Sequence, residues 1–250
     1  MIPKIIHYCW FGGSIKPKLV KKCIASWEKF CPDYEIIEWN ESNYDVTKNQ
    51  YMREAYEAKK WGFVSDLARK DIIYQYGGIY FDTDVEIIRP LDGFLTLEGF
   101  MGTEKPGVVA TGLCLGAVPK HPLIKELCDV YKDKHFINEN GSYNLTTCLE
   151  YENPVLAEHG FQPENIEQEI CGIHIFPTDC FCPQAGYATE INITENTYTI
   201  HHYMASWVSP YRKFRAQVYW TTNKLFGNKV ADLLRKLFGR KDAVLTEVKR

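Results

Sequence analysis

Long apolar runs are absent from this sequence. No stretch reaches the roughly 18 uncharged apolar residues that a membrane-spanning helix needs. Its opening, MIPKIIHYCWFGG, has neither the long apolar region nor the small-residue cleavage site of a secretory signal. Internal repeats and low-complexity linkers are also missing, and a net charge of −3 gives no reason to expect a nucleic-acid partner. We therefore expect a globular protein of the cytoplasm.

Disulfide bonds are not expected either, although the sequence contains nine cysteines. An odd number of cysteines cannot all pair, and these are scattered along the chain. A chain of 250 residues can also bury a sufficient core without covalent cross-links. Reduced thiols in the cytoplasm are therefore the simpler interpretation.

Strand and helix patterns alternate over the first 210 residues. Strands are predicted at residues 2–10, 34–39, 79–82, 85–88, 108–118 and 198–203, and helices at residues 18–30, 51–60, 65–76 and 121–134. Ser65 is the expected N-cap of the third helix, and Gly77 with Gly78 its end. This alternation predicts an α/β domain around a mainly parallel mixed sheet.

Residues 211–250 form a tail that differs in charge from the rest of the chain. It holds 11 Lys and Arg against 3 Asp and Glu, a surplus of 8 positive charges. A helical stripe of the tail is apolar, formed by Leu225, Phe226, Val230, Leu233, Leu234, Leu237 and Phe238. Such a helix either docks on the domain with a solvated basic face or lies on an anionic membrane surface. We expect a domain at residues 1–210 followed by this tail.

The segment GGIYFDTDVE, residues 77–86, contains two aspartates after an apolar strand. In an extended strand Asp82 and Asp84 point the same way, with Thr83 opposite. Mn²⁺ and Mg²⁺ commonly take one or two carboxylates and complete their coordination with water and substrate phosphates. The pattern therefore predicts a divalent-metal site that binds a nucleotide diphosphate.

The helix before this motif carries a charged pair. Asp66 and Arg69 are three residues apart and share one helix face. Apolar residues surround them, so this polar face is expected to line a site. The alternative is a surface ion pair worth less than about 1 kcal/mol. Lys70 and Asp71, in contrast, are expected to be surface charges.

Three segments together resemble a known family. IPKIIHYCWFGG, SDLARKDIIYQYGGIYFDTDVE and HHYMASW occur in this order from the N-terminus to about residue 207. They resemble the DxD-containing sugar transferases of yeast mannosyltransferase-like and bacterial capsule-synthesis enzymes (glycosyltransferase family 32). More distantly, they resemble the glucosyltransferase domains of large clostridial toxins. The resemblance implies a GT-A fold, a nucleotide-sugar donor, a divalent metal and retention of anomeric configuration.

The resemblance also implies roles for residues before the metal motif. Trp10 matches the aromatic residue that stacks on the nucleotide base, although it could instead belong to the core. Asp66 and Arg69 match the pair that holds the donor sugar and its ribose or phosphate. Tyr80 matches the aromatic residue just ahead of the motif, and could instead only pack. Asp82 matches the first motif aspartate and is expected to contact metal or ribose.

Near the end of the domain, Ser206 and Trp207 match a cap over the diphosphate and the glycosidic oxygen. Either His201 or His202 could add an imidazole to the metal, and His202 is preferred because it is closer to this cap. A satisfied core histidine is the alternative. His7, near the end of the first strand, is expected to be structural.

These features predict a retaining, metal-dependent hexosyltransferase of surface polysaccharide synthesis. Its donor would be a nucleotide diphosphate sugar, with a UDP-sugar favoured, and its acceptor a glycan or lipid-linked saccharide. Its location would be the cytoplasm, peripherally at the inner face of the membrane. One alternative is a haloacid dehalogenase-like phosphatase with Asp82 as nucleophile, but no GDxxxD motif follows. The other is a catalytically silent binding protein.

Overall fold

The computed structural model describes residues 1–184, 190–204, 218–219, 221–223, 225 and 227. The chain divides into two compact units, residues 1–185 with 191–202 and residues 186–190 with 203–250. All helices and strands named below lie in the first unit. The expected boundary at residue 210 and nearly all of the expected tail lie outside the described residues. None of the described helices is long and apolar enough to cross a membrane.

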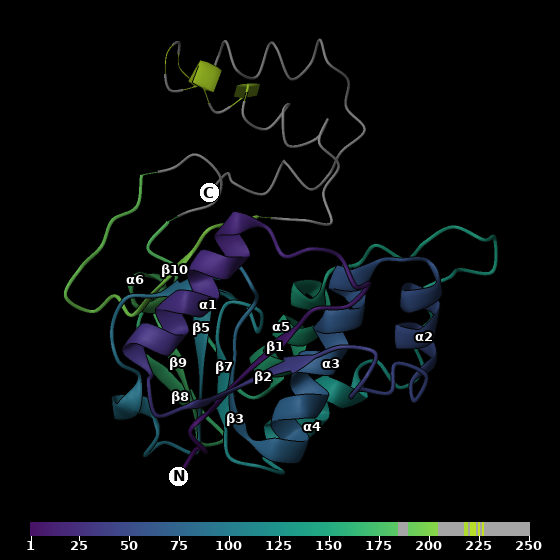
Figure 1. Ribbon diagram of the computed structural model, residues 1–250, viewed down its shortest axis with the longest axis horizontal. Coiled ribbons are helices and arrows are strands. Elements are labelled where there is room, and N and C mark those ends of the chain that lie inside the picture. The colour runs from purple at the N-terminus through teal and green to yellow at the C-terminus, as the bar shows by residue number, and fades with distance from the viewer. Residues whose placement is uncertain (185–189, 205–217, 220, 224, 226, 228–250) are drawn as a thin grey trace. The chain divides into compact units, whose positions relative to one another are not determined.

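A mixed sheet forms the centre of the first unit (Figure 1). Its strands follow the order β2-β1-β3-β7-β5-β9-β8, and β6 pairs with β5. β1 is parallel to β2 and β3, and β5 to β9, whereas β3–β7, β5–β7, β5–β6 and β8–β9 are antiparallel. The strands are β1 (Ile5–Cys9), β2 (Glu35–Trp39), β3 (Gly78–Tyr80), β5 (Gly99–Lys105), β6 (Val108–Val109), β7 (Leu115–Ala117), β8 (Gln168–Ile170) and β9 (Ile173–Phe176).

Helices cover both faces of this sheet. The chain passes from β1 to β2 through α1 and returns past β1 to β3 through α2 and α3, so right-handed crossovers place α1 opposite α2 and α3. Figure 1 shows α1 apart from α2, α3 and α4, with the strands between them. The helices are α1 (Lys18–Phe30), α2 (Gln50–Glu57), α3 (Trp61–Tyr76), α4 (Pro122–Asp129), α5 (Cys148–Glu158), α6 (Thr178–Phe181) and the 3₁₀ helix η1 (Asp92–Phe94).

A second, two-stranded sheet joins β4 (Val85–Ile87) to β10 (Thr199–His201) in antiparallel register. His201 is paired with Val85, so the late strand lies beside the aspartate motif. Two side chains of α1 also bind β4. Trp27 Nε1 donates to the Val85 carbonyl at 2.8 Å, and Ser26 Oγ accepts from the Ile87 amide at 2.9 Å.

The glycine pair at residues 77–78 fixes the geometry between α3 and β3. Gly77 (φ 65°) caps α3 at its C-terminus, and Gly78 (φ 92°) begins β3. A Cβ at Gly78 would lie 2.8 Å from the Ile5 carbonyl oxygen and 2.9 Å from His7 Nε2. Only glycine combines this positive φ with such a close approach. The pair therefore ends the helix and sets β3 directly against β1.

His7 is structural, as its position in the first strand predicts. It is fully buried, and the Trp39 indole donates to its Nδ1 at 3.0 Å. Because an indole can only donate, the proton of the neutral ring sits on Nε2, which donates to the Gly77 carbonyl at 2.9 Å. Burial lowers the pKa of His7 to about 4, so the ring stays neutral at physiological pH.

The α/β fold with a mixed sheet is confirmed, but three expected elements need correction. The third helix begins at Trp61, so Ser65 is not its N-cap and donates its hydroxyl to the Trp61 carbonyl inside the helix. The strand expected at 79–82 ends at Tyr80. The strand expected at 108–118 divides into β6 and β7, because the chain between them turns toward the aspartate motif at Gly112. The sequence pattern also missed β5, α5, β8 and β9.

Candidate active site

The two motif aspartates lie on a turn between β3 and β4. The Val85 amide donates to the Asp82 carbonyl at 3.1 Å and closes this turn. The expectation that both carboxylates share one strand face is therefore wrong. Asp82 Oδ1 lies 3.4 Å from Arg69 Nη2, whereas Asp84 Oδ1 lies 3.4 Å from His201 Nε2.

Arg69 is the charged centre of the site. Its side chain is 5% exposed, and Nη2 donates to Asp66 Oδ1 at 2.8 Å while lying near Asp82. Nε donates to the Ser65 carbonyl at 3.1 Å, which fixes the plane of the guanidinium. Burial alone would lower the pKa of Arg69, but the carboxylates of Asp82 and Asp66 hold it above its ordinary value. The helical pair is thus not a surface ion pair.

Tyr80 links the strand to the motif. Its ring is buried 5.3 Å from the Arg69 guanidinium carbon, and its hydroxyl donates to Asp82 Oδ1 at 3.0 Å. Burial raises the pKa of Tyr80, so the hydroxyl keeps its proton and remains a donor. The side chain therefore does more than pack, because it helps to orient the Asp82 carboxylate.

Gly112 is a site residue that the sequence pattern did not reveal. Its carbonyl accepts the Asp82 amide at 2.8 Å. A Cβ at this position would overlap Asp82 Oδ2 and Arg69 Nη1 and lie 2.9 Å from the Asp82 carboxyl carbon. The backbone of Gly112 is therefore a wall against which the Arg69–Asp82 pair rests. The only sequence signal for it was a glycine inside an apparent strand, which often marks close approach of a backbone.

The two late histidines face different carboxylates. His202 Nε2 bonds Glu86 Oε2 at 2.7 Å, and Glu86 also pairs with Lys22 at 2.7 Å. The imidazole near the motif is His201, whose pKa would be lowered by burial but is raised well above its ordinary value by Asp84. The preference for His202 as the imidazole beside the motif is therefore corrected, because adjacent residues in β10 and after it project to opposite sides.

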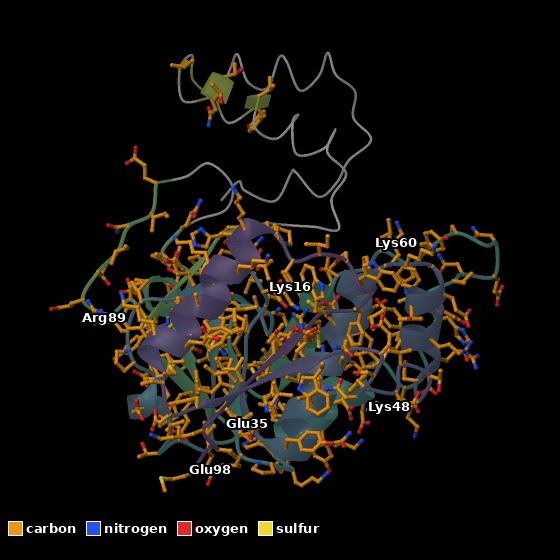
Figure 2. The ribbon with its side chains drawn as sticks, in the orientation of Figure 1. Lys16, Glu35, Lys48, Lys60, Arg89 and Glu98 are labelled. Carbon is orange, nitrogen blue, oxygen red and sulfur yellow. The ribbon has the colours of Figure 1, made fainter. Side chains whose placement is uncertain are left out.

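Trp10 follows β1 at the sheet edge where Asp82 follows β3. β1 and β3 are parallel, with His7 opposite Tyr80, so the chain leaves both strands on the same edge. Trp10 is half-buried rather than part of the core, and its Nε1 donates to the Ser14 carbonyl at 2.8 Å. Lys16, labelled in Figure 2, lies 5.8 Å from the centre of the Trp10 ring and pairs with Glu38 at 2.6 Å.

The charges next to Arg69 on α3 need one more correction. Lys70 was expected at the surface but is fully buried in an ion pair with Glu152 of α5. Asp71 is 21% exposed, pairs with Lys48 (Figure 2) and accepts the Tyr44 hydroxyl at 2.7 Å. The sequence did not indicate that Lys70 is buried, because a lysine side chain usually reaches solvent even from a mostly apolar helix.

The side chains of the motif supply only some of the ligands that a divalent cation needs. Among the described residues no group of three or more His, Cys, Asp or Glu side chains is arranged to hold a metal. Asp82 and Asp84 supply two carboxylates, and Asp82 remains 32% exposed. Mn²⁺ and Mg²⁺ suit such a set, because waters and substrate phosphates complete their coordination. Ser206 and Trp207, the expected cap, lie outside the described residues.

Residues 17–100 match the family model described as the glycosyltransferase sugar-binding region containing a DXD motif. This range includes Asp66, Arg69, Tyr80, Asp82 and Asp84, the residues that the fold gathers around the turn. The resemblance predicted from the sequence is confirmed over these residues, which are similar to the DXD-containing glycosyltransferases.

Individual relatives are similar over half of the chain or less. Over 137 residues the chain is 31% identical to inositol phosphoceramide mannosyltransferase 3 of Schizosaccharomyces pombe. This match covers 50% of this chain and 36% of that protein. Over 129 residues it is 33% identical to mannosyl phosphorylinositol ceramide synthase CSH1 of Saccharomyces cerevisiae, covering 49% and 33%. A human alpha-1,4-N-acetylglucosaminyltransferase is 35% identical over 71 residues, 28% of this chain and 19% of that protein. The chain thus matches about a third or less of the length of these relatives.

Solved structures give more distant likenesses. The PaToxG glycosyltransferase superposes with a TM-score of 0.45 and 17% identity, over 63% of this chain and 68% of that one. A glycosyltransferase involved in glycosylating the major capsid of PBCV-1 gives a TM-score of 0.45 and 13% identity, over 82% and 95%. The similarity to DXD-containing glycosyltransferases rests on the sequence matches.

Proposed function

We propose that this chain is a retaining, metal-dependent hexosyltransferase. It would move a hexose from a nucleotide diphosphate sugar, with a UDP-sugar favoured, to a glycan or lipid-linked saccharide. The match to the DXD-containing sugar-binding region supports transfer of a sugar. The names of the yeast relatives, which describe mannosyl transfer to inositol phosphoceramide, favour an acceptor carried by a lipid.

The arrangement of Arg69 carries this proposal. Its buried guanidinium lies between the carboxylates of Asp66 and Asp82, at the sheet edge where Asp82 remains partly exposed. A planar guanidinium forms paired hydrogen bonds with phosphate or carboxylate oxygens, and a fixed one needs no reordering when the ligand binds. A site built in this way suits a donor that brings both sugar hydroxyls and a diphosphate.

The chain's own residues would act mainly by positioning and electrostatics. A bound Mn²⁺ or Mg²⁺, held by Asp82 and Asp84, would neutralise charge on the departing diphosphate. Asp66 and Arg69 would hold the donor sugar and its ribose or phosphate. Trp10 would offer a ring face to the nucleotide base.

Retention is proposed to come from attack on the face that the diphosphate leaves. The acceptor hydroxyl would lose its proton to the donor's own phosphate, so no covalent enzyme intermediate is required. The Tyr80 hydroxyl would keep the Asp82 carboxylate oriented during this step, as it does through its 3.0 Å hydrogen bond. Ser206 and Trp207 are proposed to cap the diphosphate and the glycosidic oxygen.

The phosphatase alternative is less well supported by the surroundings of Asp82. A phosphoaspartate mechanism needs a lysine close to the nucleophilic carboxylate. The cation beside Asp82 is Arg69, while Lys70 is paired with Glu152. A beryllofluoride adduct trapped on Asp82 would favour this alternative. A silent binding protein would instead bind nucleotide but leave the donor sugar uncleaved.

Calorimetry tests the proposal directly. UDP and GDP are titrated into the protein with manganese chloride and, separately, with EDTA. We expect at least one nucleotide to bind more tightly with manganese, and Asp82→Asn to lose donor cleavage while still unfolding in one cooperative transition. Equal affinity in EDTA contradicts the metal assignment. No binding of either nucleotide, with or without metal, contradicts the donor class.

A further inference from the structure

A buried ion pair lies directly behind the site and takes no part in the proposed chemistry. Lys70 of α3 and Glu152 of α5 are both fully buried, and Lys70 Nζ also lies 4.6 Å from the centre of the Tyr131 ring. Removing two charges from water costs several kcal/mol each before their attraction is counted. Well-packed apolar residues of similar volume often give a protein equal stability. We therefore looked for a role of the Lys70–Glu152 pair other than stability.

The second carboxylate oxygen of Glu152 points to that reason. Oε2 accepts the hydroxyl of Thr111 at 2.8 Å, and Thr111 is fully buried. The next residue is Gly112, whose carbonyl accepts the Asp82 amide at 2.8 Å. One carboxylate therefore joins α3 to the loop that forms the wall behind Asp82.

The next residue of α5 holds the same loop at a second point. Asn153 Oδ1 accepts the Val109 amide at 2.8 Å, and its Nδ2 donates to the Val109 carbonyl at 3.0 Å. These two bonds imitate the pairing of a neighbouring strand. Residues 109–112 are thus clamped by adjacent side chains of α5, which Figure 1 shows beside α3.

The contacts form a closed ring that begins and ends on α3. Arg69 and Lys70 are consecutive, yet one reaches Asp82 and the other reaches Glu152. Between Asp82 and Glu152 stand only Gly112 and Thr111. Because Gly112 touches both Asp82 and Arg69 without room for a Cβ, a small shift of this loop must move the pair or open a gap behind it.

The geometry points to Glu152 as a positioning residue for the donor site, acting through Thr111 and Gly112 on Asp82. This inference rests on the proposed function for the meaning of that position, since Asp82 is proposed to bind donor and metal. The hydroxyl of Thr111 and the acceptor oxygen of residue 152 are the essential parts. Lys70 fixes the carboxylate and compensates its charge.

A threonine series tests the contact to the loop. Thr111→Val keeps the shape and removes the hydroxyl, whereas Thr111→Ser restores it. Thr103→Val is the matched control, because Thr103 is also buried and lies on β5 beside Val109, but its hydroxyl donates to the Phe176 carbonyl at 3.0 Å and not to Glu152. We expect Thr111→Val to bind UDP or GDP with manganese at least tenfold more weakly than wild type. Thr111→Ser and Thr103→Val should stay within about twofold.

Amide hydrogen exchange of Asp82 supplies a readout that needs no nucleotide. Its amide is bound to the Gly112 carbonyl, so a displaced loop should raise its exchange rate at least tenfold in Thr111→Val, with little change in Thr111→Ser or Thr103→Val. If wild type binds no nucleotide, the proposed function fails and this exchange rate alone decides the positioning role. Unchanged exchange and unchanged binding in Thr111→Val would overturn the inference.

Two double variants keep the test valid if single changes unfold the protein. Lys70→Met with Glu152→Gln removes both charges but leaves an amide oxygen for Thr111. Lys70→Met with Glu152→Leu removes the charges and the acceptor. We expect the first to retain Asp82 protection and the second to lose it. Equal behaviour of the two would mean that the oxygen at position 152 does not position the loop, and the inference would fall.

Discussion

At the scale of single residues, Arg69 is a buried charge whose orientation is fixed by its neighbours. Its guanidinium is shared by two carboxylates and fixed by a backbone carbonyl, so its plane is set before any ligand arrives. The Tyr80 ring and the Gly112 backbone also lie against it. The site is therefore a rigid polar cluster, and its function should depend on shape as much as on charge.

The first prediction is that Arg69→Lys is not conservative. A lysine keeps the positive charge but cannot bond Asp66, Asp82 and the Ser65 carbonyl in one plane. We expect kcat/KM for donor cleavage to fall at least tenfold, about 1.4 kcal/mol of transition-state stabilisation. Steady-state kinetics measures this with hexose donors of whichever nucleotide, UDP or GDP, binds in calorimetry. Near-wild-type kinetics would show that the guanidinium geometry is unimportant.

His7 gives a prediction about stability and pH. Its folded pKa of about 4 lies below the ordinary 6.5, so the stabilisation from the neutral ring is present above pH 6.5 and lost as the pH falls toward 4. The loss attributable to His7 should reach about 2 kcal/mol at pH 5. Urea unfolding at pH 7.5 and pH 5 measures it against His7→Gln, which can keep both hydrogen bonds without titrating. If both proteins lose equal stability, the buried neutral imidazole is not the cause.

At the scale of elements, the site is assembled where short segments meet. α3 supplies Asp66 and Arg69, the turn after β3 supplies the aspartates, and the loop between β6 and β7 supplies Gly112. None of these pieces makes the site alone. The loop contributes only backbone, which explains why a side-chain motif did not mark it.

Gly112→Ala should separate activity from stability. The added methyl group would overlap Asp82 and Arg69, so these two side chains must move. Such overpacking typically lowers the free energy of unfolding by only about 1–3 kcal/mol. We expect donor cleavage to fall roughly 100-fold or more, equivalent to about 2.7 kcal/mol. Thermal unfolding and kinetics are measured together. Gly93→Ala is the control, since nothing lies within 4 Å of its added Cβ, and an equal loss there would discount the steric argument.

At the scale of the whole molecule, the sequence predicts a tail with its own task. Residues 211–250 hold 8 more positive than negative charges on a segment that can form an amphipathic helix. Each Lys or Arg near an anionic surface contributes about 1 kcal/mol within a Debye length. We propose that the tail holds the protein peripherally at the inner face of a membrane that carries the acceptor.

Removing the tail should therefore change transfer more than donor cleavage. A chain ending at Tyr211 should keep donor cleavage, lose transfer to a lipid-linked saccharide and fail to float with anionic liposomes. Full-length protein should float at low salt and be released at high salt. If neither form floats, or if the shortened chain unfolds, the tail is a structural helix packed on the domain.

The sequence by itself determined the alternating α/β plan, the first helix, the end of α3 at its glycine pair and the family motif. These features depend on local rules: apolar periodicity, glycine at positive φ, and residue types at fixed spacing. The pairing of Asp66 with Arg69 was also predictable, because positions three apart on a helix are neighbours whatever the fold.

Only the tertiary structure decided which distant groups meet. Lys70 is buried because Glu152 lies opposite it, 82 residues later in the chain. His201 rather than His202 faces Asp84 because β10 pairs with β4 in one register, and a shift by one residue would exchange them. Gly112 became part of the site because its backbone, without a side chain, lies against Asp82. Contacts between residues far apart in sequence depend on how the chain packs, and local patterns carry no record of that packing.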